Sequence, residues 1–197
     1  SDLSKNVQVQ SSGEIVKNGK MSKQSSMQKH GMIIVFGGDG LFLSASKIAY
    51  NLDIPILGIN FGKIGFLVDV DKKDIIKKVF EIVKGGYVID KRIMIDGKII
   101  DINDKIIKST SLNDIVIYNY GLLKMIQAKI FINDFLINIQ RSDGVIVSTP
   151  TGSTAYSMSN GCPIVSPSAN VISITPISPH TYSPRPIIIN SSDVIRI

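Results

Sequence analysis

Two short segments of this chain carry residue types that could bind and activate a hydroxyl-bearing or phosphorylated ligand. The first is Gly-Gly-Asp-Gly at residues 37–40, directly after an apolar run. The second is Thr-Pro-Thr-Gly-Ser-Thr-Ala-Tyr-Ser at residues 149–157, where most side chains are small hydroxyls. Hydroxyl groups both donate and accept hydrogen bonds, so this loop could hold phosphates and sugar hydroxyls, and its tyrosine adds a flat face for a base. Together the two segments suggest phosphoryl transfer to a sugar alcohol.

The aspartate of the first segment is its most informative residue. Glycines let backbone N–H groups approach a phosphate closely, and a helix N-terminus attracts negative charge. Asp39 opposes that attraction, so its presence needs another reason. The carboxylate could accept a proton from a hydroxyl nucleophile, or it could hold a divalent metal that bridges phosphates. The simpler interpretation is a turn in which Asp39 caps the next helix, and the motif alone indicates only a kinase-like protein.

The spacing of apolar residues predicts the elements that would position the aspartate. Residues 32–36 and 54–60 are apolar runs typical of buried parallel strands, and residues 41–51 have helical spacing. This order predicts a βαβ unit. Residues 71–84 predict a second helix that ends at two glycines. The apolar face of that helix would consist of Ile75, Ile76, Val79, Phe80 and Val83.

After the glycines at residues 85 and 86, apolar residues recur at every second position, as they do in half-buried strands. Residues 92–101 predict a hairpin with its turn at Asp96-Gly97, a dipeptide that type I′ turns favour. Further strands are expected at residues 114–118, 125–132, 135–141, 144–148, 171–175 and 186–190. The second and third of these strands are expected to form a hairpin around Asn133-Asp134. The predicted fold class is an α/β N-terminal domain with parallel βαβ units, residues 1–86, followed by an all-β, β-sandwich-like domain, residues 87–197. Residues 1–30 hold few large apolar side chains and are expected to be mobile or a loop.

Composition narrows the classes of partner. The 197 residues are 44% apolar and carry a net charge of +6, which attracts anions such as nucleotides. The cations are spread along the chain and aromatic residues are only 7%, so no nucleic-acid partner is expected. The single cysteine, Cys162, fits a reducing, cytoplasmic location. No apolar run is long enough to span a membrane, so no membrane partner is expected.

The order of the motifs resembles that of bacterial NAD kinases, also called inorganic polyphosphate/ATP-NAD kinases. The resemblance extends from about Met32 to the C-terminus. It rests on residues 37–40, Gly58-Ile59-Asn60 with Gly62, Gly65, Phe66 and Leu67, Leu112-Asn113-Asp114, Arg141-Ser142-Asp143-Gly144, residues 149–159, and residues 176–180 before Arg185-Pro186. Several ordered motifs argue against chance similarity.

The resemblance implies transfer of a phosphoryl group from ATP, or from polyphosphate, to the adenosine ribose 2′-OH of NAD, giving NADP. A divalent metal such as Mg²⁺ would assist, with no residue assigned as its ligand. Asp39 would be the general base, with Gly40 beside it and Phe66 next to the substrate. Asn113 and Asp114 match an Asn-Glu pair that binds adenosine, and Asp114 is one methylene shorter than Glu. The other matches to substrate-binding positions are Lys124, Arg141 and Asp143, the last two near the nicotinamide half, and Thr151, Thr154, Ala155, Tyr156, Ser157, Met158 and Ser159.

The resemblance also implies a homodimer or homotetramer in which neighbouring subunits complete pockets. Leu41 departs from the family pattern, which usually has Thr or Asn there. The chain ends at Ile197, where the family carries more strands, so the second domain is expected to be truncated. Two alternatives remain open. One is a lipid kinase of the diacylglycerol or sphingosine kinase type, which shares the Gly-Gly-Asp-Gly turn, and the other is a non-catalytic NAD-binding fragment.

Overall fold

A computed structural model describes residues 6–18 (backbone only), 31–62, 65–68, 70–119, 121, 124–180 and 185–197. The chain divides into two compact units, Gly13–Arg92 and Ser1–Ser12 together with Ile93–Ile197. The domain boundary after residue 86 stays a prediction. Within the described part of the chain, no helix combines the length and the apolar character that crossing a membrane requires.

A parallel sheet forms the core of the unit Gly13–Arg92. Its order is β2 (Ile33–Gly37), β3 (Ile56–Asn60) and β4 (Val70–Asp71). β2 pairs with β3 in parallel from Ile33↔Ile56 to Gly37↔Asn60. Helix α2 (Asp39–Leu52) connects these two strands. The predicted βαβ unit is therefore confirmed.

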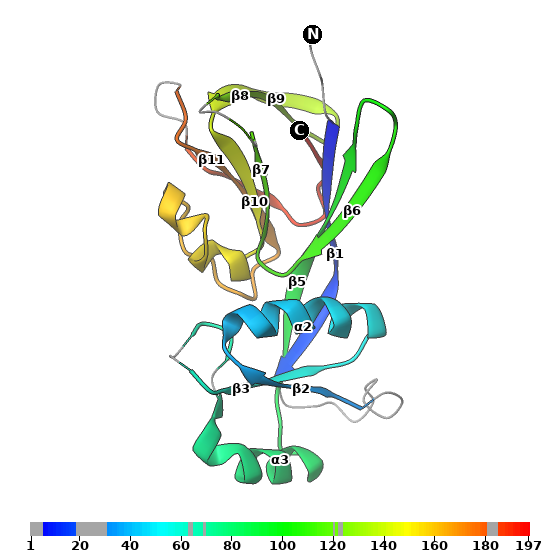
Figure 1. Ribbon diagram of the computed structural model, residues 1–197, viewed down its shortest axis with the longest axis vertical. Coiled ribbons are helices and arrows are strands. Elements are labelled where there is room, and N and C mark those ends of the chain that lie inside the picture. Colours follow the sequence, from blue (N-terminus) through cyan, green and yellow to red (C-terminus); the bar gives the residue numbers. More distant parts are fainter. Residues whose placement is uncertain are drawn as a thin grey trace. The chain divides into compact units, whose positions relative to one another are not determined.

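Helices cover both faces of this sheet, as Figure 1 shows for α2 and α3 (Ile75–Val83). On one face Phe42 of α2 packs so close to Gly58 that a Cβ there would lie 3.0 Å from its ring. On the other face Leu57 and Ile59 pack with residues of α3. Successive residues of β3 face α2 and α3 in turn. Both faces of the strand are therefore covered, which explains its continuous apolar sequence.

The second helix differs from its prediction in where it begins and in which side it buries. Residues Lys72–Asp74 form a 3₁₀ turn, and α3 then runs from Ile75 to Val83. Gly85, with φ of 80°, ends the helix as expected. The predicted apolar face is wrong in part because the helix packs on the sheet through Ile75 and Ile82, which leaves three of its large side chains outside. Those exposed residues are Ile76, Phe80 and Val83.

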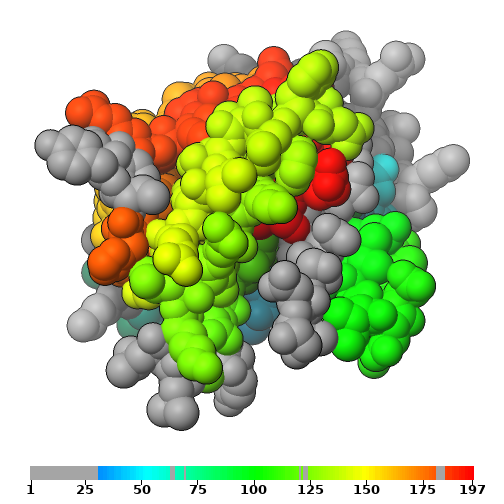
Figure 2. Space-filling view, turned by 90° about the horizontal axis from the view of Figure 1, so that it is seen from above, coloured from blue at the N-terminus to red at the C-terminus, as the bar shows by residue number. Residues whose placement is uncertain are grey.

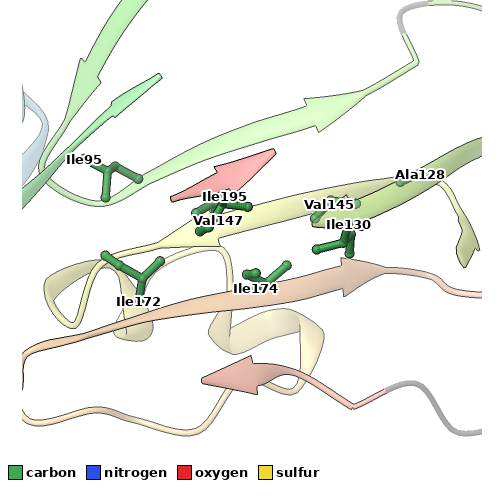
Figure 3. Packing of buried hydrophobic residues seen from close by; sticks show 8 residues of the cluster. All are labelled: Ile95, Ala128, Ile130, Val145, Val147, Ile172, Ile174 and Ile195. Atoms are coloured by element: carbon green, nitrogen blue, oxygen red, sulfur yellow. The ribbon is translucent and has the colours of Figure 1, made fainter. Parts of the chain in front are cut away.

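Two antiparallel sheets form the unit that contains Ile93–Ile197. The first has the order β6 (Ile106–Ser111), β5 (Ile89–Ile100), β1 (Asn6–Asn18), β13 (Ile195–Arg196), β8 (Ile126–Ile132), β9 (Phe135–Ser142). The second has the order β12 (Ile187–Asn190), β11 (Val171–Ile177), β10 (Gly144–Ser148), β7 (Asp114–Tyr118). Side chains from β5, β8 and β13 meet those from β10 and β11 in a shared core (Figure 3). This packing confirms the predicted β-sandwich-like fold.

Strand β1 corrects the expectation that residues 1–30 are mobile or a loop. Residues Asn6–Asn18 are a strand, and β1 pairs with β13 through Gln8↔Arg196 and Val9↔Ile195. The rest of that segment, residues 1–5 and 19–30, lies outside the described residues. The polar composition did not predict the strand because its neighbours in the sheet, β5 and β13, come from distant parts of the chain, and strand formation depends strongly on such neighbours.

The predicted hairpin turn at Asp96-Gly97 is also wrong. Strand β5 continues through both residues and pairs with β6 from Ile95↔Ser111 to Ile100↔Ile106. The turn lies at residues 101–105, where Asp104 has φ of 58°. Gly97 serves packing instead, since a Cβ there would lie 2.6 Å from Cδ1 of Ile115 in the opposite sheet.

The β8–β9 hairpin agrees with its prediction. Asn133 and Asp134 both have positive φ, 49° and 67°, as a two-residue type I′ turn requires. Figure 2 shows this hairpin, in yellow-green, on the surface beside the C-terminal strand β13, in red. β9 is the last strand of its sheet among the described residues. Its exposed apolar side chains are Phe135, Leu136, Ile137 and Ile139.

Candidate active site

Asp39 lies at the carboxyl end of the parallel sheet. β2 ends at Gly37, Gly38 is the N-cap of α2, and Asp39 is the first helical residue. Within the described residues no side chain caps this helix, so the interpretation of Asp39 as a cap is wrong. Ligands of open α/β sheets bind at this end of the strands. The aspartate therefore stands where the fold favours a ligand.

The carboxylate of Asp39 is held by the segment between β3 and β4. The backbone N–H of Phe66 donates to Oδ2 at 2.8 Å, and that of Leu67 donates to Oδ1 at 3.2 Å. A carboxylate has about four lone-pair sites, so each oxygen can still accept another hydrogen bond. These contacts orient the group and leave it able to bind a hydroxyl.

Three predicted site residues come together in this unit. Gly40 is exposed and follows Asp39 directly, while the Phe66 ring is 73% exposed beside the carboxylate that its own backbone binds. The contact between Asp39 and residues 66 and 67 was not predicted. The parallel pairing of β2 and β3 offered a signal, because the carboxyl ends of neighbouring parallel strands meet at one edge of a sheet.

Leu41, the departure from the family pattern, lies in the first turn of α2. Its side chain is 53% exposed and leans over the end of β2, where a Cβ on Gly37 would lie 2.9 Å from its Cδ2. The side chain carries no hydrogen-bond donor. An anion at this place would meet the free backbone N–H groups at the start of α2 but no donor from the Leu41 side chain.

The loop after β10, residues 149–159, is called the hydroxyl loop. Most of its hydroxyl groups form hydrogen bonds within the protein. It contains two 3₁₀ turns, Thr151–Thr154 and Met158–Asn160. Thr149 Oγ1 donates to the Leu112 carbonyl at 2.5 Å, and Ser153 Oγ donates to the Pro150 carbonyl at 2.7 Å. Both of these hydroxyl-bearing side chains are buried. The loop is thus a rigid platform more than an open row of hydroxyls.

The predicted binding residues of this loop differ in their exposure. Ser157 is fully buried, and its hydroxyl donates to the Gly152 carbonyl at 2.9 Å. Thr151 is also buried. Thr154 and Ala155 are half-buried. The exposed members are Tyr156, Met158 and Ser159.

Asn113 and Asp114 lie against this loop. The Asn113 carbonyl accepts hydrogen bonds from the Thr149 N–H at 2.8 Å and from Ser148 Oγ at 3.3 Å. Gly152 packs on the same carbonyl with no room for a Cβ. The Asn113 side-chain oxygen is buried, and no donor from the described residues reaches it. Burial raises the pKa of the Asp114 carboxyl.

The remaining predicted residues lie at the other end of β10. In the register of this sheet, Ser148 pairs with Asp114 while Gly144 pairs with Tyr118. Asp143 precedes Gly144, so it is separated from the hydroxyl loop by the length of β10, roughly 15–20 Å. Arg141 is at the same end, where its carbonyl accepts the His180 N–H at 2.8 Å. Within one chain, the structure does not bring these residues to the hydroxyl loop.

Lys124 belongs to the same end as Asp143. It follows β7 at the Tyr118 end, and its carbonyl accepts a hydrogen bond from the Asn119 side chain at 3.1 Å. Lys124, Arg141 and Asp143 are all exposed. The predicted residues of this unit therefore fall into two groups: Asn113, Asp114 and the loop at one end of β10, and these three at the other.

Metal-binding and thiol groups are sparse in the described residues. They contain no group of three or more His, Cys, Asp or Glu side chains that could hold a metal ion. Cys162 is a buried free thiol.

The chain thus combines a parallel α/β unit, with a half-buried carboxylate at its strand ends, and a β-sandwich that carries a hydroxyl-rich loop, an arrangement suited to binding a phosphorylated ligand. Family models agree: the ATP-NAD kinase N-terminal domain matches residues 5–87, and the ATP-NAD kinase C-terminal domain matches residues 112–197. The chain belongs to the NAD kinase family. The lipid-kinase alternative is not favoured.

Curated relatives show the same similarity. The chain is 41% identical over 166 residues to the NAD kinase of Teredinibacter turnerae, covering 84% of this chain and 57% of that protein. It is 40% identical over 181 residues to the NAD kinase of Caldanaerobacter subterraneus, covering 92% of this chain and 64% of that protein. It is 38% identical over 182 residues to that of Escherichia coli, covering 92% and 62%. The chain therefore spans about three-fifths of the length of these relatives.

Solved structures resemble the fold. A yeast NADH kinase in complex with NADH matches with a TM-score of 0.78 and 32% identity, over 83% of this chain and 49% of that one. An NAD kinase from Archaeoglobus fulgidus in complex with ATP matches with a TM-score of 0.66 and 24% identity, over 88% and 68%. The second likeness concerns the fold alone.

Proposed function

We propose that this chain transfers a phosphoryl group from ATP to the adenosine ribose 2′-OH of NAD and so makes NADP. Family membership supports this reaction. The observation that carries it is the Asp39 carboxylate, oriented by two backbone N–H groups at the ligand-binding end of a parallel sheet. Polyphosphate is a second phosphoryl donor that the resemblance allows.

Asp39 would act as the general base. A ribose hydroxyl is a poor nucleophile at neutral pH, and a positioned base typically contributes about 10²–10⁴ in rate. As the 2′-oxygen forms its bond to the γ-phosphorus, its proton passes to the carboxylate and ADP leaves. The rest of the barrier is lowered by alignment and by charge neutralisation.

The second unit would bind the dinucleotide. The Asn113 side-chain oxygen, which no donor of the described residues reaches, is an acceptor that an adenine amino group could satisfy, and Asp114 follows it in the chain. An unsatisfied buried acceptor is destabilising until a donor reaches it, which favours a ligand there. The exposed Tyr156 ring offers a stacking face. The contacts proposed for Thr151, Thr154, Ala155, Ser157, Met158 and Ser159 stay predictions.

Mg²⁺ is the proposed metal. This ion keeps several waters and is commonly bound through substrate phosphates, so it would be carried largely by ATP while Asp39 acts as the base. When bound, it would neutralise charge on the phosphoryl oxygens. The net charge of +6 also favours anionic substrates.

A homodimer or homotetramer would account for the residues at the far end of β10. Arg141 and Asp143 do not reach the hydroxyl loop of their own chain, so they are free to complete the pocket of a neighbouring subunit. Lys124 lies at the same end. The cytoplasmic location stays a prediction from cysteine usage.

The variant Asp39→Asn tests the proposed base. We expect NADP formation to fall by about 10²–10⁴, while NAD binding, measured by titration calorimetry, changes only a few-fold. Asp53→Asn is the matched control, because Asp53 is exposed and its φ of 51° is a conformation that asparagine accepts. Undiminished turnover in Asp39→Asn would remove this carboxylate from the mechanism. NAD binding by the unaltered chain without any NADP would support the non-catalytic alternative.

A further inference from the structure

We infer that Gly65 is a positioning residue for the Asp39 carboxylate, because only a residue without a side chain leaves the space that this carboxylate occupies. The inference rests on the proposed function, in which Asp39 is the base. It assigns a role in catalysis to a residue that offers no functional group of its own.

The contact joins two segments that are distant in sequence. Asp39 begins α2, which follows β2. Residues 65–67 follow β3, the parallel strand next to β2. The N–H groups of Phe66 and Leu67 donate to different oxygens of the same carboxylate. Two bonds to two oxygens fix the rotation of the carboxylate as well as its position.

Glycine is required here for space and not for backbone conformation. Gly65 is not among the glycines with positive φ in the described residues. A Cβ added to it would have Oδ1, Cγ and Oδ2 of Asp39 as its three nearest heavy atoms, all far inside van der Waals contact. Every one of these atoms belongs to the carboxylate group. A side chain at residue 65 must therefore displace the carboxylate or the segment that binds it.

The neighbouring Gly62 provides a matched comparison. It lies in the same connection between β3 and β4, and a Cβ there would meet no described residue within 4 Å. Its N–H bond to the Asn60 side chain, 2.8 Å, would persist in alanine. The same chemical change at residue 62 thus leaves Asp39 untouched.

The displaced carboxylate would slow the chemical step more than it would weaken substrate binding. A misplacement of about 1 Å in a reacting group can reduce the rate about 10²-fold. We expect Gly65→Ala to reduce kcat by about that factor, with KM for NAD and the thermal midpoint close to the wild-type values. Gly62→Ala should keep the wild-type kcat. A merely structural role for Gly65 would instead lower the thermal midpoint and leave kcat of the folded fraction unchanged.

Amide hydrogen exchange gives a readout that does not depend on activity. In the wild-type chain and in Gly62→Ala, the Phe66 and Leu67 amides should be protected. In Gly65→Ala both should exchange faster. In Asp39→Asn one of the two should lose protection, because the amide NH₂ cannot accept a hydrogen bond.

The outcomes separate the inference from the proposed function. Wild-type kcat in Gly65→Ala, or unchanged protection of both amides in that variant, would overturn the role of Gly65. A wild-type chain that makes no NADP would overturn the proposed function, while the exchange data would still decide whether Gly65 makes room for the Asp39 contact.

Discussion

At the scale of single residues, two aspartates illustrate how position changes the behaviour of one side chain. Asp39 is oriented by backbone N–H groups at the end of a strand. Asp114 is partly buried beside the hydroxyl loop, where loss of hydration disfavours its charged form and raises its pKa. The first arrangement suits proton transfer. In the second, the charged carboxylate destabilises the folded state, and a ligand that donates a hydrogen bond to it could reduce that cost.

The raised pKa of Asp114 makes a prediction about stability and pH. A carboxyl whose pKa is raised by folding stabilises the folded state fully below the unfolded value of about 3.9, and that contribution is lost as pH rises through the folded-state pKa. Asp114→Asn removes the charge, so we expect it to raise the thermal midpoint at pH 7 and to have a smaller effect at pH 4. Calorimetric unfolding at both pH values measures this. A midpoint lowered at pH 7, or the same increase at both pH values, would contradict the assignment.

At the scale of elements, the hydroxyl loop combines a buried scaffold with an exposed rim. Its buried hydroxyls donate to carbonyl groups that also accept a backbone N–H within the 3₁₀ turns, so each of these carbonyls has two donors. The exposed side chains are then held on a fixed backbone. Because the loop is already ordered without a ligand, less conformational entropy would be lost when a ligand binds.

Two serines in this loop separate the scaffold from the rim. Ser157→Ala removes one of two donors to the buried Gly152 carbonyl, which keeps the Ala155 N–H, so we expect a loss of about 0.5–1.5 kcal/mol in unfolding free energy. Ser159 is exposed, so Ser159→Ala should change stability by less than about 0.5 kcal/mol. Chemical denaturation of both variants makes the comparison. Equal losses from the two substitutions would mean that the buried network does not hold the loop.

The sequence predicted those elements whose signal is local. The βαβ unit, the Asn133-Asp134 hairpin and the strands at residues 114–118 and 144–148 follow from apolar runs and turn residues, and they are confirmed. The errors concern long-range partners. Strand β1 depends on β13, and Gly97 serves the packing of Ile115 and not a turn.

The same distinction holds for the site. Asp39, Asn113 and the hydroxyl loop could be singled out from residue type and spacing. The partners of the Asp39 carboxylate could not, because backbone N–H groups have no sequence signature. The division of the loop hydroxyls into buried and exposed also depends on three-dimensional packing, which a row of Ser and Thr does not reveal.

At the scale of the whole molecule, the family resemblance implies a site shared between subunits, and the separation of Arg141 and Asp143 from the hydroxyl loop is compatible with that proposal. If each pocket takes Asp39 from one subunit and Asp143 from another, two inactive variants should complement each other. We expect a refolded equal mixture of Asp39→Asn and Asp143→Ala to regain about a quarter of the wild-type activity for a two-fold dimer. The measurement is NADP formation before and after mixing. A mixture that stays inactive, while wild-type chains treated alike recover, would contradict sharing.

The most direct test of the central claim is the position of the transferred phosphate. The chain would be incubated with NAD, ATP and Mg²⁺, and the product resolved by ³¹P NMR. The account predicts a phosphomonoester on the 2′-oxygen of the adenosine ribose, formed in equal amount to ADP and nearly absent with Asp39→Asn. Formation of ADP without this ester, or a phosphate on any other oxygen of NAD, would contradict the account.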